Sequence, residues 1–200
     1  ANAELLVFDG HPGEWLARIA EAGKNRMTLA AEGRTREPEV VPDVWLAFAA
    51  VKRSQTDWLV EKATELGVAR LIPVMTRRTV AERVKMERLE AITMEAAEQC
   101  GRTLLPQTGE PMPLARFLES NERTLYFADE RGGRPAALAF QPAPATILTG
   151  PEGGFTDKER DAIRAAREAI PISLGPRILR AETAALAALA SYMAVAGDWR

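Results

Sequence analysis

The sequence predicts an α/β protein in which helices flank a mostly parallel β-sheet, with a small β domain in front of it. Three observations support this fold class. From Trp45 onward, apolar runs of strand length alternate with segments that have helical periodicity. Two Gly-Pro loops each follow a strand and lead into a helix. Before Pro42, in contrast, short strand-like pieces are separated by turn residues.

The first segment is expected to form a small barrel or sheet. Its strands are predicted at Glu4–Phe8, Trp15–Ala20 and Arg26–Ala31. A Pro-rich, acidic connection at Glu37–Asp43 marks a domain boundary, so we expect one domain over residues 1–43 and a second over residues 44–200. The chain begins with Ala1 and enters a strand almost at once, which indicates that it begins inside the first domain.

The second domain opens with alternating strands and helices. Gly67 should cap the first helix, and a stripe of apolar and small residues marks the second. The expected elements are a strand at Trp45–Ala50, a helix at Ser54–Leu66, a strand at Val68–Met75, a helix at Met86–Cys100, and strands at Thr124–Ala128 and Ala145–Thr149.

The final third repeats one arrangement twice. The strand ending at Thr149 runs into the loop Gly150–Phe155, and a capping box formed by Thr156 and Glu159 then starts a helix. We expect Ala162, Ile163 and Ala166 to form the apolar face of that helix. A strand at Ile170–Leu174 enters a second loop, and an Ala- and Leu-rich helix follows, ending near Gly197.

Composition excludes several classes of protein. With 46% hydrophobic and 27% charged residues, the chain resembles an ordinary globular protein, and its net charge of −2 does not by itself indicate nucleic acid. The single cysteine, Cys100, excludes an internal disulfide and a cysteine-cluster zinc site, and no metal is expected. No apolar run is long enough to span a bilayer and no signal pattern opens the chain, so we expect a cytoplasmic protein without a membrane partner.

The two Gly-Pro loops are the strongest candidates for a ligand site. Open α/β sheets bind ligands at the carboxyl ends of their strands, glycines let a ligand approach the backbone, and prolines hold a loop in shape. Such loops can also serve only to turn the chain. The dinucleotide-binding and P-loop phosphate motifs are absent from the sequence. His11 is the only histidine and lies in a predicted turn of the N-terminal segment, so a Ser-His-Asp or Cys-His catalytic arrangement is not expected.

Four ordered motifs resemble a known family. The chain from Trp45 to its end is similar to the bacterial 16S rRNA uracil-N3 methyltransferases, the RsmE-type branch of the SPOUT superfamily, and Asp9-Gly10 with Glu14-Trp15 resembles the end of that family's N-terminal PUA-like barrel. The opening strands of the barrel are missing, so we expect residues 1–43 to form a partial RNA-binding domain. The four motifs are Asp57–Gly67, Glu95–Arg102, Thr149–Phe155 and Leu174–Ala184.

The resemblance implies a deep trefoil knot in the second domain, a homodimer with a shared active site, and S-adenosylmethionine as cofactor. It implies that the two Gly-Pro loops hold the cofactor, although Leu179 could equally belong to the core. The residues assigned to the cofactor pocket are Leu148, Thr149, Gly150, Glu152, Gly153, Gly154, Leu174, Gly175, Ile178, Leu179 and Thr183.

Arg180 and Glu152 are the candidate catalytic residues. A cation at Arg180 would stabilise the negative charge that develops on uracil as N3 loses its proton. Alternatively, Arg180 forms an ion pair with Glu182. Glu152 could hold the cofactor's amino group, orient the base, or only cap the loop.

Basic residues suggest where RNA is bound. Between Arg70 and Arg88, six Lys or Arg residues stand against two glutamates, which is consistent either with phosphate contact or with a solvated face. The residues assigned to RNA are Lys52, Arg53, Arg77, Arg78 and Arg102. The substrate implied by the resemblance is 16S rRNA in the decoding region of the small ribosomal subunit. Ribose 2′-O or guanine-N1 methylation is the alternative chemistry, and a non-catalytic RNA-binding protein of the same fold is the alternative class.

Overall fold

The computed structural model describes residues 3–8, 13–79, 84–142 and 144–199. Contacts divide the chain into two units. Unit 1 comprises residues 1–40 and 97–105, and unit 2 comprises residues 41–96 and 106–200. Asp9-Gly10, His11 and Arg83, which entered the sequence interpretation, lie outside the described residues.

Unit 1 contains a three-stranded antiparallel sheet in the order β1-β2-β3, formed by β1 (Glu4–Phe8), β2 (Glu14–Ala22) and β3 (Met27–Arg36). The sheet is open rather than closed into a barrel, and large apolar side chains such as Leu6, 61% exposed, lie on its surface. The segment that follows α2 (Met86–Cys100) belongs to the same unit because the Arg102 guanidinium donates to Glu39 at 2.9 Å and the Glu39 amide donates to Thr103 at 3.0 Å.

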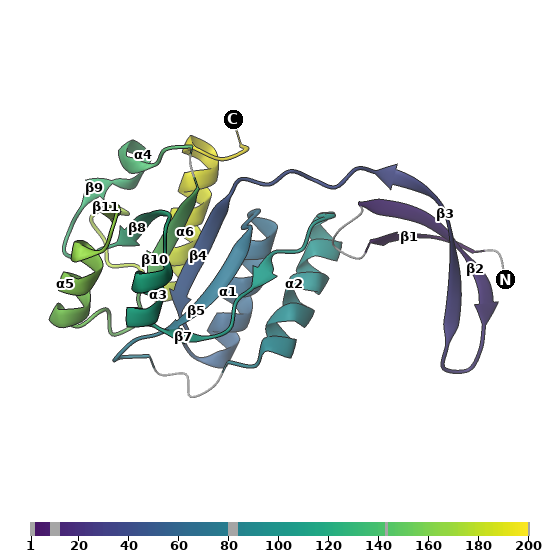
Figure 1. The fold of residues 1–200 in the computed structure, drawn as a ribbon, viewed down its shortest axis with the longest axis horizontal. Coiled ribbons are helices and arrows are strands. Elements are labelled where there is room, and N and C mark those ends of the chain that lie inside the picture. Colours follow the sequence, from purple (N-terminus) through teal and green to yellow (C-terminus); the bar gives the residue numbers. More distant parts are fainter. Residues whose placement is uncertain (1–2, 9–12, 80–83, 143, 200) are drawn as a thin grey trace. The chain divides into compact units, whose positions relative to one another are not determined.

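Unit 2 is built around a sheet whose described strands all pair in parallel. β10 lies between β4 and β8, and β11 pairs with the other side of β8. Figure 1 shows this order, and the short strands β6, β7 and β9 extend the edges. The strands are β4 (Val44–Ala49), β5 (Arg70–Met75), β6 (Gln107–Thr108), β7 (Met112–Pro113), β8 (Thr124–Ala128), β9 (Arg134–Pro135), β10 (Ala145–Thr149) and β11 (Ala169–Ser173).

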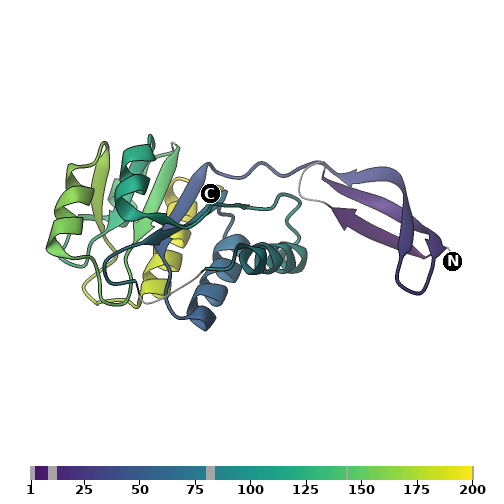
Figure 2. The same cartoon turned by 60° about the horizontal axis from the view of Figure 1, so that its bottom comes forward.

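Helices cover both faces of the sheet (Figure 1, Figure 2). Successive strand residues alternate between the two cores: Ile147 joins the core under α1, α2, α4 and α6, whereas Leu148 joins the core under α3 and α5. The helices are α1 (Arg53–Glu65), α2 (Met86–Cys100), α3 (Leu114–Ser120), α4 (Ala136–Ala139), α5 (Asp157–Ala165) and α6 (Ala181–Val195). This α/β arrangement confirms the expected fold class.

Local signals placed the long elements well. α2 has the expected bounds, Gly67 follows α1 with a φ of +88°, and the capping box of Thr156 and Glu159 starts α5. The expected apolar face of α5 was partly wrong. Ala162 is exposed, and the buried residue beside Ile163 is Arg160.

The end of the chain returns across the sheet. After β11, near one edge, the chain passes back to form α6, which packs against α1, β4 and β10. This return path is the crossing on which the expected knot depends. It also places the start of α6 beside the loops that leave β8 and β10.

Candidate functional site

A pocket of about 290 Å³ lies at the carboxyl edge of three neighbouring strands. Its walls are the loops that follow β8, β10 and β11, together with Ala181 and Ala184 at the start of α6. Loops at the carboxyl ends of adjacent parallel strands are the usual ligand site of an open α/β sheet, and the volume is near the lower end for small-molecule sites.

The loop after β10 contributes backbone to this pocket. Thr149, Gly150, Glu152 and Gly154 line it, whereas Leu148 is buried in the sheet and Gly153 lies on the outer side of the loop. Gly154 has a φ of +66°, and a Cβ there would approach Glu130 Oε1 to 3.1 Å. The backbone conformation therefore favours glycine at this position.

The loop after β11 forms the opposite wall. Leu174, Gly175, Ile178 and Leu179, which the sequence analysis assigned to the cofactor, line the pocket, and Ile178 is 87% exposed. Thr183 does not line the pocket, and its side chain is exposed on the first turn of α6. An exposed apolar side chain at a pocket mouth offers contact area to a ligand that enters.

The third wall was missed by sequence reasoning. Asp129, Glu130, Arg131 and Gly132, which follow β8, also line the pocket. The signal was present, because an acidic pair followed by two glycines stands directly after an expected strand. A Cβ on Gly133 would lie 2.4 Å from Pro171 O, so only glycine permits this loop to pass so close to β11.

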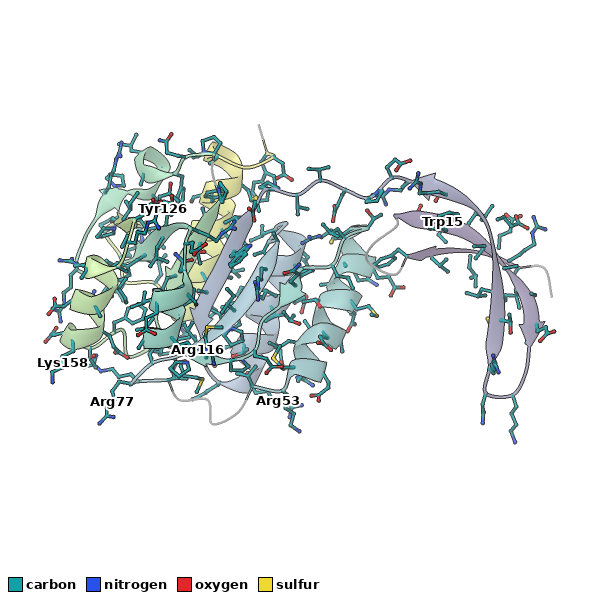
Figure 3. The ribbon with its side chains drawn as sticks, viewed as in Figure 1. Trp15, Arg53, Arg77, Arg116, Tyr126 and Lys158 are labelled. Atoms are coloured by element: carbon teal, nitrogen blue, oxygen red, sulfur yellow. The ribbon has the colours of Figure 1, made fainter. Side chains whose placement is uncertain are left out.

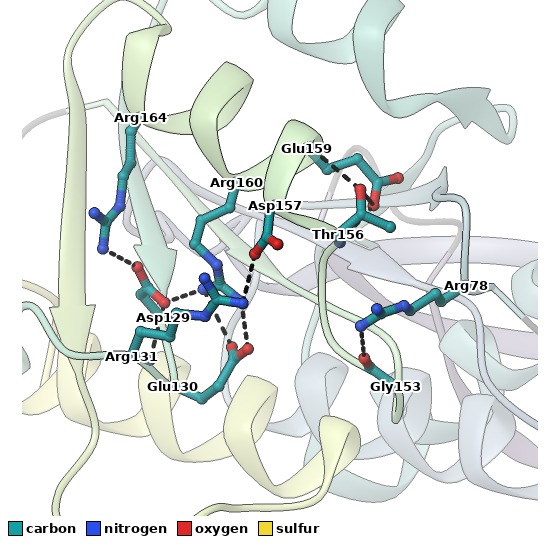
Figure 4. Close-up of polar contacts among 10 residues, drawn as sticks. All are labelled: Arg78, Asp129, Glu130, Arg131, Gly153, Thr156, Asp157, Glu159, Arg160 and Arg164. Carbon is teal, nitrogen blue, oxygen red and sulfur yellow. Dashed lines mark hydrogen bonds and ion pairs between the residues drawn. The ribbon is translucent and has the colours of Figure 1, made fainter.

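A buried ion network fixes this third wall (Figure 4). The side chain of Asp129 is fully buried and accepts hydrogen bonds from Arg160, and from Arg164 at 2.6 Å. Arg160, 3% exposed, also pairs with Glu130. An internal guanidinium that faces two carboxylates compensates their charge and holds the loop in one position.

The two candidate catalytic residues take different positions. Glu152 lines the pocket and accepts a hydrogen bond from Gln55 Nε2 at 3.3 Å. Arg180 is the N-cap residue of α6, exposed, and lies between the pocket-lining Leu179 and Ala181. Within the described ranges no ion pair joins Arg180 to Glu182, whose buried Oε2 meets no hydrogen-bond donor there.

The basic residues assigned to RNA do not form one group. Lys52 and Arg53 are exposed at the start of α1, and Arg77 is exposed in the turn after β5. Arg78 instead donates to Gly153 O at 2.6 Å, which ties this turn to the loop after β10. Arg102, 5% exposed, is paired with Glu39 within unit 1, so its guanidinium has a structural partner.

The first turn of α5 joins these loops. Burial alone would raise the pKa of Glu159, but hydrogen bonds from the Arg77 amide and from the Thr156 amide and hydroxyl, with the nearby charge of Arg78, lower the pKa below its ordinary value. Glu159 therefore stays ionised and holds the turn after β5 against α5.

None of the described helices is long and apolar enough to cross a membrane. Within residues 3–8, 13–79, 84–142 and 144–199, no group of three or more His, Cys, Asp or Glu side chains is arranged to hold a metal ion.

Comparison with known proteins identifies the family. Residues 37–193 match the model of the RNA methyltransferase domain. The chain is 32% identical to ribosomal RNA small subunit methyltransferase E of Rickettsia conorii, over 94% of this chain and 80% of that protein. The chain belongs to this family of RNA methyltransferases. The family member from Synechocystis is 34% identical, over 96% of this chain and 66% of that protein.

Solved structures of the family share the fold. The ribosomal RNA small subunit methyltransferase E of Neisseria gonorrhoeae, bound to S-adenosylmethionine, superposes with a TM-score of 0.89 at 27% identity and covers 100% of this chain and 86% of its own. A methyltransferase from Legionella pneumophila, also in complex with S-adenosylmethionine, gives 0.88 at 30% identity, over 98% and 85% of the two chains. Both are methyltransferase folds with the cofactor present.

Proposed function

We propose that this protein transfers a methyl group from S-adenosylmethionine to N3 of a uridine in 16S rRNA of the small ribosomal subunit. The observation that carries the proposal is the pocket formed by three loops at the carboxyl edge of β8, β10 and β11, in a chain whose relatives are ribosomal RNA small subunit methyltransferases. The cytoplasm, where ribosomes are assembled, is the compartment that this function implies.

The residues of the pocket suit the proposed cofactor. S-adenosylmethionine supplies an electrophilic methyl group on a positively charged sulfonium. Glu152 lines the pocket and forms no ion pair with a described residue, so its carboxylate offers negative charge to a ligand that carries a sulfonium and an ammonium group. Gly150, Gly154 and Gly175 leave backbone groups accessible for the adenosine part.

The chemistry at the RNA needs a base in its anionic form. Uridine N3 carries a proton at neutral pH, and this proton must leave before N3 can form a bond to the methyl carbon. The bond from carbon to sulfur breaks as the bond to N3 forms, and its electron pair stays on sulfur. Arg180, between Leu179 and Ala181 at the pocket, supplies a cation beside the uracil anion, and this electrostatic contribution is often the largest in catalysis.

The RNA and the second subunit complete the site. We assign Lys52, Arg53 and Arg77 to phosphate contact because their side chains are exposed. In this proposal, residues 1–43 belong to a PUA-like RNA-binding domain, and residues 44–200 form the SPOUT methyltransferase domain. We also propose a homodimer that pairs through α6, whose small residues include the half-buried Ala184, Ala187 and Ala190.

Methylation of small ribosomal subunits tests this function. Subunits from a bacterial strain that lacks the modification are incubated with the protein and labelled S-adenosylmethionine, and the digested nucleosides are analysed by mass spectrometry. We expect 3-methyluridine. A 2′-O-methylated nucleoside or 1-methylguanosine would contradict methylation at N3 and show that a different atom is methylated. Cofactor binding without any methylated product would indicate a non-catalytic protein.

A further inference from the structure

A second concave surface lies beside the loop after β10. We call it the basic groove and define it by Met75, Arg77, Arg78, Leu114, Leu118 and Lys158. It is formed by the turn after β5, the start of α3 and the first turn of α5. None of its residues lines the cofactor pocket, so it is a separate surface.

The floor of the groove is apolar. Met75, at the end of β5, and Leu118, on α3, are both half-buried, and Leu114 is buried and belongs to the core. An apolar floor of this kind can pack against the flat face of an unstacked base, because every base presents such a face.

The groove carries a net positive charge, with three basic residues against two acids among the residues that line it. Arg77 and Lys158 are exposed, and neither side chain forms an ion pair with a described residue. Figure 3 shows both at the same edge of unit 2. Two acids also line the groove: Asp157 pairs with Arg131 at 2.5 Å, and Glu159 accepts hydrogen bonds from Thr156 and from the backbone of Arg77. Exposed Arg and Lys without acidic partners suit phosphate groups.

A direct contact connects this groove to the cofactor pocket. Arg78 lines the groove, and its Nη1 donates to Gly153 O at 2.6 Å, within the loop that forms one wall of the pocket (Figure 4). Thr156, which follows the same loop, also lines the groove. A strand bound in the groove therefore lies against the loop that forms one wall of the cofactor pocket.

We propose that the basic groove binds the single-stranded segment of RNA next to the target uridine. Arg77 and Lys158 bind its phosphates, and the floor at Met75 and Leu118 packs against one unstacked base. This proposal rests on the proposed function, because it places the RNA that the cofactor pocket acts on. An acidic peptide would also pair with the positive charge of the rim, but its acidic side chains would not pack against the apolar floor as a base does.

Charge reversal with a matched control tests the groove. The double variant Arg77→Glu/Lys158→Glu is compared with the unaltered chain and with Arg167→Glu, an exposed residue just beyond the other end of α5. Binding of a single-stranded rRNA fragment is measured at several salt concentrations, together with calorimetry of S-adenosylmethionine and methylation of small subunits. We expect the double variant to lose at least about tenfold in RNA affinity and about 1.4 in the slope of log K against log salt, at roughly 0.7 per phosphate contact.

Cofactor affinity should stay within about twofold in all variants, since the altered side chains lie outside the pocket. RNA affinity of the double variant equal to that of Arg167→Glu would overturn the proposal. If the unaltered chain methylates no subunit, the proposed function is contradicted instead. The comparison of RNA affinities then still shows whether the groove binds RNA.

A second variant distinguishes binding of a base from binding of phosphate alone. Leu118→Ser should weaken binding of a uridine oligonucleotide several-fold and leave competition by inorganic polyphosphate unchanged, with circular dichroism showing that the fold is retained. Equal binding of polyphosphate and RNA, with no effect of Leu118→Ser, would show a general anion surface and contradict the proposal. Tighter binding of an acidic peptide than of RNA would indicate a protein partner and contradict it too.

Discussion

Arg180 occupies the junction between the loop after β11 and α6, between the pocket-lining Leu179 and Ala181, and its side chain is exposed. A cation there does little for neutral uracil and stabilises the anion. Arg180→Ala should therefore lower kcat about a hundredfold or more, the effect of losing one transition-state donor. Affinity for S-adenosylmethionine should change only a few-fold.

Steady-state kinetics and calorimetry on the same preparation check this prediction. Arg180→Lys is the informative companion, because lysine keeps the charge but loses the planar guanidinium, and we expect it to rescue poorly. Normal turnover of Arg180→Ala, or outright loss of cofactor binding, would show a structural role and direct attention to Arg177, which lines the pocket.

Glu159 should make stability depend on pH. Its folded pKa is lowered, so its stabilisation is present above the ordinary pKa range of a glutamate and is lost as pH falls through the folded pKa. Glu159→Gln should reduce the free energy of unfolding by about 1–2 kcal/mol at neutral pH, the scale of hydrogen bonds to a charged group. The difference from the unaltered chain should shrink in strong acid.

Urea unfolding at neutral pH and at about pH 3 measures this difference. Asp161→Asn is the matched control, since this exposed residue of the same helix has no ion pair with a described residue. A deficit of Glu159→Gln that stays constant across the pH range would show that the loss is one of packing.

At the scale of elements, the loop after β8 depends on α5. Asp129 accepts hydrogen bonds from Arg160, which is buried, and from Arg164, whose side chain is 46% exposed. Asp129→Ala should cost about 3 kcal/mol, near the lower end for breaking a buried pair, because Glu130 still faces Arg160. Arg164→Ala should cost less than about 1 kcal/mol, because its charge is screened by water.

Urea unfolding compares the two variants, and calorimetry under folding conditions tests the pocket. Because the loop forms one wall, Asp129→Ala should also weaken S-adenosylmethionine binding at least about tenfold. Equal stability losses for Asp129→Ala and Arg164→Ala would contradict the buried network as the source of the effect.

At the scale of the whole molecule, we expect a homodimer. Helix α6 presents small residues that permit another helix to approach closely, and a large half-exposed side chain, Trp58, lies on the neighbouring α1. Light scattering at micromolar concentration should give twice the mass of one chain. Ala187→Glu should yield monomers with little turnover, because it buries a charge between subunits.

Ala165→Glu, an exposed position on α5 at the other face of the sheet, is the control and should remain dimeric. A monomeric unaltered protein that methylates RNA at full rate would contradict both the dimer and a site shared between subunits.

The sequence by itself determined the long elements and the position of two pocket walls. Local signals predicted these elements: the stripe on α2, the cap at Gly67 and the capping box of α5. Each signal depends only on residues within one or two helical turns, so it can be recognised without knowledge of the fold. The Gly-Pro loops were recognised for the same reason, since each adjoins its strand in the chain.

Only the tertiary structure decided which loops meet. The order of the strands places β8 between β10 and β11, and this adjacency brings the Asp129 loop into the pocket as its third wall. Tertiary contacts also bury Arg160 on a helix face that periodicity predicts to be apolar. In unit 1 they pair Arg102 with Glu39, which is distant in the chain. Periodicity indicates which side of an element is buried. A charged residue, however, is buried only when a partner elsewhere in the chain compensates its charge. The topology of the fold determines which residue that partner is.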